Sequence, residues 1–451
     1  MRKSLHFLVL FARSLLAHSD LGQTEIYGLG TSLIPSGDLV CLVDLKHEQC
    51  QDGNCDRSEQ HVWTHSSPCF QGDHAEQPIC VFTNTRFADG RGISLVTTPK
   101  RASYLASSPA FTNPESVHGI NQDLHPTVPT KYEMRHIPGK GMGLIATAPI
   151  PRGEQIMANT ASLMIDYRAF NELTREQYTA LQAHAVARLP PDHAAAILAL
   201  SPDATTNNNN NSTTRADLID AIAATNGFDI DPTPTDPDQH HSFFVLFPAI
   251  ARMNHDCRPS AEYRYTPPHL AQVVVAARDI LPGEELTLSY INPLMVRARR
   301  VGRLKKNWGF ECGCALCALE GARRRAADGR VERIAEVRRE LAVWPEEGEV
   351  RGRTGRASPE MGELLVGLYE MERLWGSMHE AYAMAALEFS GVGDAWTAVR
   401  YASLGLEWGI PMLGEEDEEV EELRSLAEDP WGHWSWMKRV VGEEGEGEGR
   451  V

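Results

Sequence analysis

The sequence lacks any run of the roughly 18 consecutive apolar residues that a membrane-spanning helix needs. It also lacks an excess of positive charge, because 43 lysines and arginines face 61 aspartates and glutamates, a formal net charge of −18. We therefore expect no membrane span and no direct nucleic-acid partner, and a basic protein is the easier electrostatic match. With 451 residues, 42% of them hydrophobic, the chain can bury a core spread over two or three structural units.

The N-terminus allows two interpretations. Arg2 and Lys3 precede an apolar stretch, and small residues follow at positions 17–19, which together are typical of a secretory signal peptide. Arg13 interrupts the apolar stretch and weakens that pattern. Residues 1–19 are thus either a cleaved signal or an ordinary part of the chain.

Residues 20–121 contain five cysteines that fit no metal pattern. Their number is odd, so a closed set of disulfides is excluded, and two bridges plus one free thiol can form. None of them has the C-x-x-C spacing of a zinc ligand pair. We expect short strands and loops in this region, for example at 79–82 and 92–96, and assign it no function. The cysteines are Cys41, Cys50, Cys55, Cys69 and Cys80.

From residue 131 the pattern changes to a run of hairpins. Residues 132–135 alternate, Gly139–Gly143 form a turn, and a strand follows at 144–148. Residues 171–240 interrupt this pattern with helical segments at 171–203 and 217–224. Between these segments, an asparagine run at 207–211 indicates a solvent loop. Strands resume at 243–247, 261–265, 272–277 and 286–290.

The C-terminal third is helical in pattern. Expected helices are joined by short turns, which resembles a tetratricopeptide-like stack, but no clean repeat period emerges and a packed helical cap is the plainer interpretation. We assign this helical region to 321–414 and an acidic, solvated tail to 415–451. The expected helices span 331–341, 361–374, 378–389 and 395–406.

Three motifs follow one another in a specific order. They are Asn254-His255-Asp256-Cys257, then Gly283-Glu284-Glu285-Leu286-Thr287-Leu288-Ser289-Tyr290, then the C-x-C-x-x-C spacing of Cys312, Cys314 and Cys317. They resemble the Asn-His-x-Cys motif, the Gly-Glu-Glu-Leu-Thr-x-x-Tyr motif and the post-SET cysteines of SET-domain lysine methyltransferases. Gly139–Gly143 and Pro151–Glu154 resemble the N-terminal half of the same domain. The resemblance covers roughly 131–166 and 242–318.

The resemblance implies an α+β fold. It places a β-rich SET domain, a β-clip with a threaded loop, at 131–292, with 171–240 as a helical insertion. A post-SET zinc-binding segment would follow at 293–320, and then the all-α C-terminal region. The related SET-and-MYND proteins insert a zinc finger into the domain, but 171–240 contains no cysteine. We therefore expect a relative of that group that lacks the MYND finger.

Zinc is the first chemistry that the motifs predict. Three thiolates within six residues can wrap one ion, but they leave one corner of its tetrahedron empty. The resemblance implies that Cys257 fills this corner, which gives one structural site of Cys257, Cys312, Cys314 and Cys317. The alternative is four independent reduced thiols, with Cys257 buried as a small hydrophobic residue.

The resemblance also implies S-adenosylmethionine as the methyl donor. Residues expected to bind it are Lys140, Gly141, Met142, Gly143, Asn254 and His255. Without the resemblance, the glycine-rich segment is more simply a hairpin turn, and His255 a hydrogen-bonded core histidine.

Tyr290 is the expected catalytic residue. Methyl transfer to an amine is an in-line displacement, so the enzyme must supply alignment and a neutral amine. A free lysine has a pKa of about 10.4, and an apolar channel beside a sulfonium lowers it. The resemblance implies that the Tyr290 hydroxyl binds the amine at the end of this channel. The alternative for an aromatic residue at a strand end is core packing. Expected channel walls are Tyr263, Tyr265 and Phe247.

Two further features bear on this prediction. Ser260 stands where the family usually has asparagine, which puts one hydrogen bond of the threaded loop in doubt. Basic residues between 297 and 306 could contact nucleic acid or an acidic peptide, but a solvated helix face is the simpler interpretation. These residues are Arg297, Arg299, Arg300, Arg303, Lys305 and Lys306.

The leading hypothesis is therefore a monomeric protein-lysine N-methyltransferase acting on a histone or another protein. The resemblance favours an intracellular location, nuclear or cytoplasmic. A second hypothesis is a SET-fold interaction scaffold that has lost turnover. A third, based on the N-terminus alone, is a secreted, disulfide-bearing protein of unrelated activity.

Overall fold

The computed structural model describes most of the chain. The asparagine run at 207–211, the candidate signal at 1–19 and the first three N-terminal cysteines lie outside the described residues. No helix among the described residues is both long enough and apolar enough to cross a membrane. The described residues are 62–72, 76–117, 119–125, 127–202, 214–232, 242–344 and 357–440.

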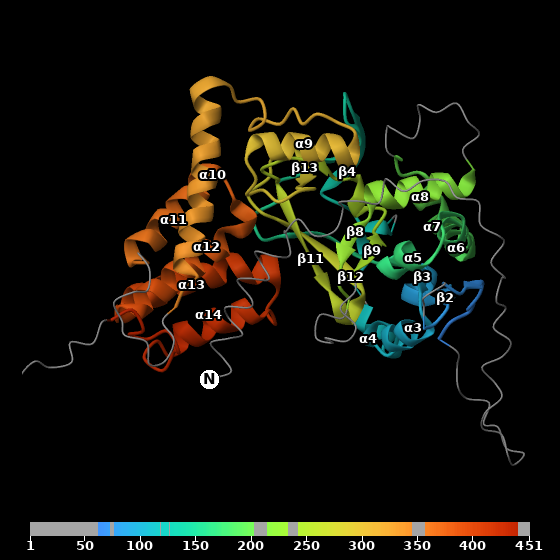
Figure 1. Cartoon of the computed structure of the whole chain (residues 1–451), viewed down its shortest axis with the longest axis horizontal. Helices are drawn as coiled ribbons and strands as arrows, with labels where there is room; N and C mark the ends of the chain where they lie inside the picture. The colour runs from blue at the N-terminus through green and yellow to red at the C-terminus, as the bar shows by residue number, and fades with distance from the viewer. Residues whose placement is uncertain are drawn as a thin grey trace, which may run out of the picture.

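A six-stranded sheet joins the N-terminal region to the centre of the chain (Figure 1). The boundary that we expected near residue 121 is therefore wrong as a structural boundary, because β3 pairs in parallel with β7. Cys69 and Cys80, opposite each other on β1 and β2, form a disulfide. The strand order is β1 (Cys69–Phe70), β2 (Ile79–Asn84), β3 (Ile93–Thr97), β7 (Leu163–Asp166), β9 (Phe243–Leu246) and β8 (Phe228–Ile230).

Two smaller sheets carry the motifs. The expected strands at 261–265 and 272–277 are confirmed, and the expected strand at 286–290 ends earlier, so that Tyr290 lies two residues past it. One sheet has the order β10 (Asn254–His255), β13 (Glu285–Leu288), β5 (Gly141–Ala146) and β4 (Tyr132–Ile137). The other has the order β11 (Ala261–Thr266), β12 (Ala271–Ala276) and β6 (Gln155–Thr160).

Helices cover one face of the six-stranded sheet. Thr174 and Thr214 each begin a helix with a capping box, in which the side chain and the residue three positions later satisfy each other's backbone N–H groups. Leu181 and Ile222 are buried in one cluster with residues of β2, β3, β7 and β9. The helices are α5 (Tyr167–Glu172), α6 (Arg175–Arg188), α7 (Pro191–Leu198) and α8 (Arg215–Asn226). Shorter helices near the N-terminus are α2 (Phe87–Gly90), α3 (Pro99–Ala106) and α4 (Pro109–Thr112).

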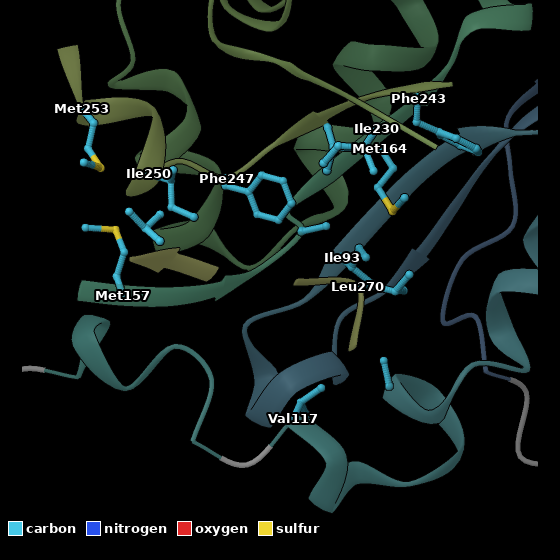
Figure 2. Close-up of a cluster of buried hydrophobic side chains, with 14 of the residues drawn as sticks. Ile93, Val117, Met157, Met164, Ile230, Phe243, Phe247, Ile250, Met253 and Leu270 are labelled. Carbon is cyan, nitrogen blue, oxygen red and sulfur yellow. The ribbon is translucent and has the colours of Figure 1, made fainter. Parts of the chain in front are cut away.

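The main core extends to the segment that precedes Asn254 (Figure 2). Met157, Phe247, Ile250 and Met253 are all at most 2% exposed and belong to one cluster with Ile93 of the N-terminal region. Burial of each such side chain stabilises the fold by about 1.5–3 kcal/mol. The backbone that presents the Asn-His-x-Cys motif is thus fixed by the core beneath it.

The C-terminal third forms a separate helical body with its own core (Figure 1). The acidic tail that we expected from residue 415 is wrong in part, because residues 418–428 form a helix that buries Val420, Leu423 and Leu426. Apolar residues at helical spacing outweigh the surrounding glutamates, and the Asp417 side chain caps the first turn. The helices of this body are α10 (Gly321–Leu341), α11 (Pro359–Glu372), α12 (Met378–Gly391), α13 (Ala395–Leu413) and α14 (Glu418–Glu428). The preceding helix, α9 (Arg297–Trp308), lies outside it (Figure 1), and Trp308 donates to the Thr225 carbonyl of α8 at 3.0 Å.

Candidate active site and cysteine cluster

The four downstream cysteines meet in space. The sulfur atoms of Cys257, Cys312, Cys314 and Cys317 all lie within 4.8 Å of one another. Cys257 Sγ lies 3.5 Å from that of Cys317 and 4.0 Å from that of Cys312. A tetrahedral zinc ion with Zn–S bonds of about 2.3 Å places its sulfurs about 3.8 Å apart. The separations and the all-sulfur donor set therefore fit a tetrahedral metal site.

Hydrogen bonds to the cluster come from the elements around it. The backbone N–H of Cys317 donates to Cys314 Sγ at 3.5 Å, and Arg297 at the start of α9 donates to the Cys317 carbonyl at 2.7 Å. The Arg297 backbone N–H donates to Asp328 of α10 at 2.7 Å. The three-cysteine loop is thus held between the two helices that flank it in sequence, as a supporting shell around a metal site requires.

His255 connects the cysteine cluster to Tyr290. Its Nδ1 accepts the backbone N–H of Tyr290 at 3.1 Å, so the ring proton resides on Nε2, which faces Cys257 Sγ at 3.3 Å. Burial lowers the pKa of His255 to about 4, which keeps the ring neutral. Because both ring nitrogens are occupied, His255 can offer a bound molecule only its main chain.

The Tyr290 side chain is enclosed by aromatic rings. The ring centres of His255, Trp308 and Phe310 lie 5.4, 5.3 and 6.5 Å from its own. The hydroxyl donates to the Met253 carbonyl at 2.8 Å, and burial raises the pKa of the phenol well above its usual range. The hydroxyl is therefore neutral and fixed beside the backbone that leads into Asn254.

A second polar group lies between β5, β10 and β13. Glu285 accepts from the Asn254 amide at 2.9 Å and from the Lys140 ammonium at 2.5 Å. The Asn254 amide also lies 3.4 Å from the Met142 carbonyl. A Cβ on Gly143 would collide with Ile137 Cδ1 and stand 2.7 Å from the Asn254 amide nitrogen, so a larger residue there would displace both side chains. The cluster offers an ammonium, an amide, a carboxylate and a carbonyl within one small space.

Comparison with known proteins places these features in a family. Residues 141–291 match the family model described as SET domain. The protein named histone-lysine N-methyltransferase set5 from Schizosaccharomyces pombe is 26% identical over 313 residues, which cover 67% of this chain and 85% of that protein. Residues 141–291 therefore carry a SET domain, and the chain is similar to proteins named lysine methyltransferases.

Members of the SMYD group share shorter segments. N-lysine methyltransferase SMYD2-A from Danio rerio is 33% identical over 126 residues, 28% of this chain and 26% of that protein. Histone-lysine N-methyltransferase SMYD3 from Homo sapiens is 39% identical over 75 residues, 17% of each protein. The chain thus matches most of the set5 protein but about a quarter or less of these SMYD relatives.

The structure gives partners for Ser260 and for two of the expected channel-wall residues. Ser260, which replaces the usual asparagine, exchanges hydrogen bonds with Thr287 of β13, so the loop after Cys257 is still tied to that strand. Tyr263 contacts Phe228, and Phe247 is buried in the main core. The ring contacts of Tyr290 within the described residues go to other side chains, so the channel-wall role of Tyr263, Tyr265 and Phe247 stays a prediction.

Three residues of the site were not predicted from the sequence. Glu285 joins Lys140 to Asn254, and its only signal was its place in the Gly-Glu-Glu-Leu motif. Trp308 and Phe310 enclose Tyr290 and precede the three-cysteine loop. Two aromatic residues next to a cysteine cluster could have indicated a role in the site, but the neighbouring sequence does not indicate that they contact Tyr290.

Proposed function

We propose that this chain transfers a methyl group from S-adenosylmethionine to a lysine ε-amine of a protein substrate. One observation carries the proposal: the segment Asn254–Cys257 touches the Lys140 and Glu285 cluster at one end, the sulfur cluster at the other and Tyr290 between them. The segment of four residues from Asn254 to Cys257 thus connects the proposed donor site, the segment of the predicted catalytic Tyr290 and the proposed metal site.

The polar cluster matches the charged end of the donor. S-adenosylmethionine carries a carboxylate and an ammonium on its amino-acid end. Lys140 and the Asn254 amide can bind the carboxylate, while Glu285 and the Met142 carbonyl can bind the ammonium. The open, positive-φ backbone at Gly139 and Gly141 allows close approach of a bound molecule, since a Cβ there would meet nothing within 4 Å.

The substrate amine would be bound from the Tyr290 side. The neutral hydroxyl and the Met253 carbonyl that it contacts can together orient an amine lone pair toward the donor methyl. The surrounding rings of His255, Trp308 and Phe310 would shield a bound amine from water, which would lower the pKa of a substrate lysine and favour its reactive neutral form.

Zinc would have a structural role in this proposal. Bound by Cys257, Cys312, Cys314 and Cys317, it would close the post-SET segment over the threaded loop and keep Trp308 and Phe310 against Tyr290. We likewise propose that the SET domain spans 131–292 and that the post-SET zinc-binding segment spans 293–320. The substrate is a lysine-bearing protein, and the net charge of −18 favours a basic one such as a histone in the nucleus or cytoplasm.

The test is transfer of labelled methyl from S-adenosylmethionine to recombinant histones and to a protein extract. We expect incorporation that acid hydrolysis assigns to methyl-lysine, together with donor binding measured by calorimetry. Donor binding without any incorporation would support the scaffold hypothesis instead. No heat of donor binding in a folded, zinc-loaded protein would refute the proposal.

A further inference from the structure

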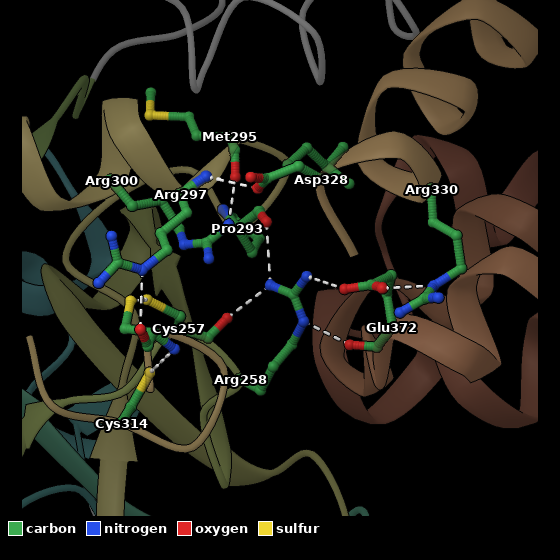
Figure 3. A network of polar contacts seen from close by, with 12 residues as sticks. Cys257, Arg258, Pro293, Met295, Arg297, Arg300, Cys314, Asp328, Arg330 and Glu372 are labelled. Atoms are coloured by element: carbon green, nitrogen blue, oxygen red, sulfur yellow. Dashed lines mark hydrogen bonds and ion pairs between the residues drawn. The ribbon is translucent and has the colours of Figure 1, made fainter. Parts of the chain in front are cut away.

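One buried guanidinium joins the candidate active site to the helical body. Arg258, directly after Cys257, has a side chain that is only 9% exposed (Figure 3). Its Nη1 donates to the Cys257 carbonyl at 2.7 Å and to the Pro293 carbonyl at 2.9 Å. Its Nη2 donates to Glu372 Oε2 at 2.7 Å, and its Nε donates to the Glu372 backbone carbonyl.

Glu372 is the last residue of α11, and its side chain is 1% exposed. Its other carboxylate oxygen accepts from Arg330 of α10 at 2.6 Å. Each oxygen of this carboxylate therefore receives one guanidinium, and both helices belong to the helical body. A carboxylate buried in this way is held in place by charge-assisted hydrogen bonds.

Two of the segments that Arg258 contacts belong to the proposed site. Cys257 contributes a sulfur to the cluster, and Pro293 lies three residues after Tyr290. The same stretch is already tied at His255, which accepts the Tyr290 backbone N–H. If Glu372 were neutral, Arg258 would lose its counter-charge and reorient toward water, which would release both carbonyls at once.

We propose that Arg258 is a positioning residue. Through Glu372 it makes the geometry of Cys257 and of the Tyr290 segment depend on the docked helical body. Its effect on methyl transfer rests on the proposed function, whereas its effect on Cys257 does not.

The chain supplies a matched control. Arg439 and Glu388 form a second buried pair, with side chains 7% and 1% exposed and a contact of 3.0 Å from Arg439 Nε to Glu388 Oε2. This pair lies wholly within the helical body, where Arg439 also bonds the Leu341 and Val343 carbonyls. Glu372→Gln and Glu388→Gln therefore each remove a carboxylate charge at equal burial, which faces Arg258 and Arg330 at Glu372 and Arg439 at Glu388, but only the first is connected to Cys257.

The experiment measures three quantities in the full chain and in each variant. They are the alkylation rate of Cys257, mapped by mass spectrometry, the thermal midpoint, and kcat and KM for labelled methyl transfer. Cys257 is 0% exposed, so its alkylation reports opening of the loop whether or not zinc is bound. We expect Glu372→Gln to speed Cys257 alkylation at least tenfold and to lower kcat about tenfold. We expect Glu388→Gln to leave the Cys257 alkylation rate and kcat within twofold of the unmodified chain, while its thermal midpoint falls about as much as that of Glu372→Gln.

Arg258→Lys guards against a variant that fails to fold. Lysine keeps the charge for Glu372 but lacks the planar fork that reaches both carbonyls, so we expect a folded protein with faster Cys257 alkylation. Equal alkylation rates in Glu372→Gln, Glu388→Gln and the unmodified chain would overturn the proposal. If the unmodified chain transfers no methyl group, the proposed function fails, and the alkylation rates still decide the role of Arg258.

Discussion

Replacing Tyr290 with phenylalanine separates a catalytic hydroxyl from a structural one. The hydroxyl donates to the Met253 carbonyl at 2.8 Å, and Met253 is 1% exposed. Removing the donor from a buried acceptor costs about 1–3 kcal/mol of folding free energy. For domains of 150–250 residues each kcal/mol lowers the thermal midpoint by about 2–4 °C. We therefore expect a drop of roughly 2–12 °C from the structural role alone.

The catalytic role predicts a much larger effect on turnover. If the hydroxyl also orients the substrate amine, its loss should lower kcat by about 100-fold, which corresponds to about 2.7 kcal/mol of barrier. Binding of S-adenosylmethionine should stay within about threefold of the unmodified chain, because Lys140, Glu285 and Asn254 are unchanged. Calorimetry measures the donor affinity, and initial rates with labelled donor measure kcat.

Tyr369→Phe is the matched control for this experiment. The Tyr369 hydroxyl is also buried and contacts Arg338 and Glu380 at 3.1 Å each, but it lies in the core of the helical body. This variant should lose similar thermal stability and keep its turnover. A Tyr290→Phe protein that melts like the control and keeps kcat within threefold would refute the catalytic assignment and leave Tyr290 as a structural tether.

Three further perturbations test the site and the helical body. Cys257→Ser should lower the bound zinc, measured by mass spectrometry of metals, to well under half of that in the unmodified chain, and unchanged zinc would contradict the proposed ligand set. Gly143→Ala should weaken donor binding at least tenfold by displacing Asn254, and an unchanged calorimetric affinity would count against this contact. Burial lowers the pKa of His379, but Glu419 at 2.7 Å outweighs it and raises the value to about 9. Since the folded pKa exceeds the unfolded value of about 6.5, this stability is complete below pH 6.5 and lost as pH rises through 9. The loss should reach at most about 3 kcal/mol, and a thermal midpoint that falls equally in His379→Gln would exclude this origin.

Local patterns in the chain were sufficient for much of the fold. The alternation at 261–265 and the apolar run at 272–277 predict the strands that form β11 and β12. Helical spacing predicts α11 and α12 nearly to their ends. These patterns succeed because the buried positions of a strand or helix recur every few residues. The spacing of apolar residues within one segment is therefore enough to predict its secondary structure.

The same local evidence failed where composition and packing compete. The glutamates of 415–422 indicated a solvated tail, yet Val420, Leu423 and Leu426 are buried against the rest of the helical body. Burial of three apolar side chains depends on a partner surface that lies elsewhere in the chain. The surface is formed by residues such as Leu365 and Ala402, which no window around residue 420 contains.

The sequence by itself determined the order of the motifs and the C-x-C-x-x-C spacing, and it predicted Tyr290 and the four cysteines as residues of the proposed site. Only the tertiary structure decided which groups face one another. Glu285 meets Lys140 across 145 residues, and Arg258 meets Glu372 across 114. Such pairs form because separate sheets and helices pack against a common core, and a contact between distant segments has no period or spacing that could be detected along the chain.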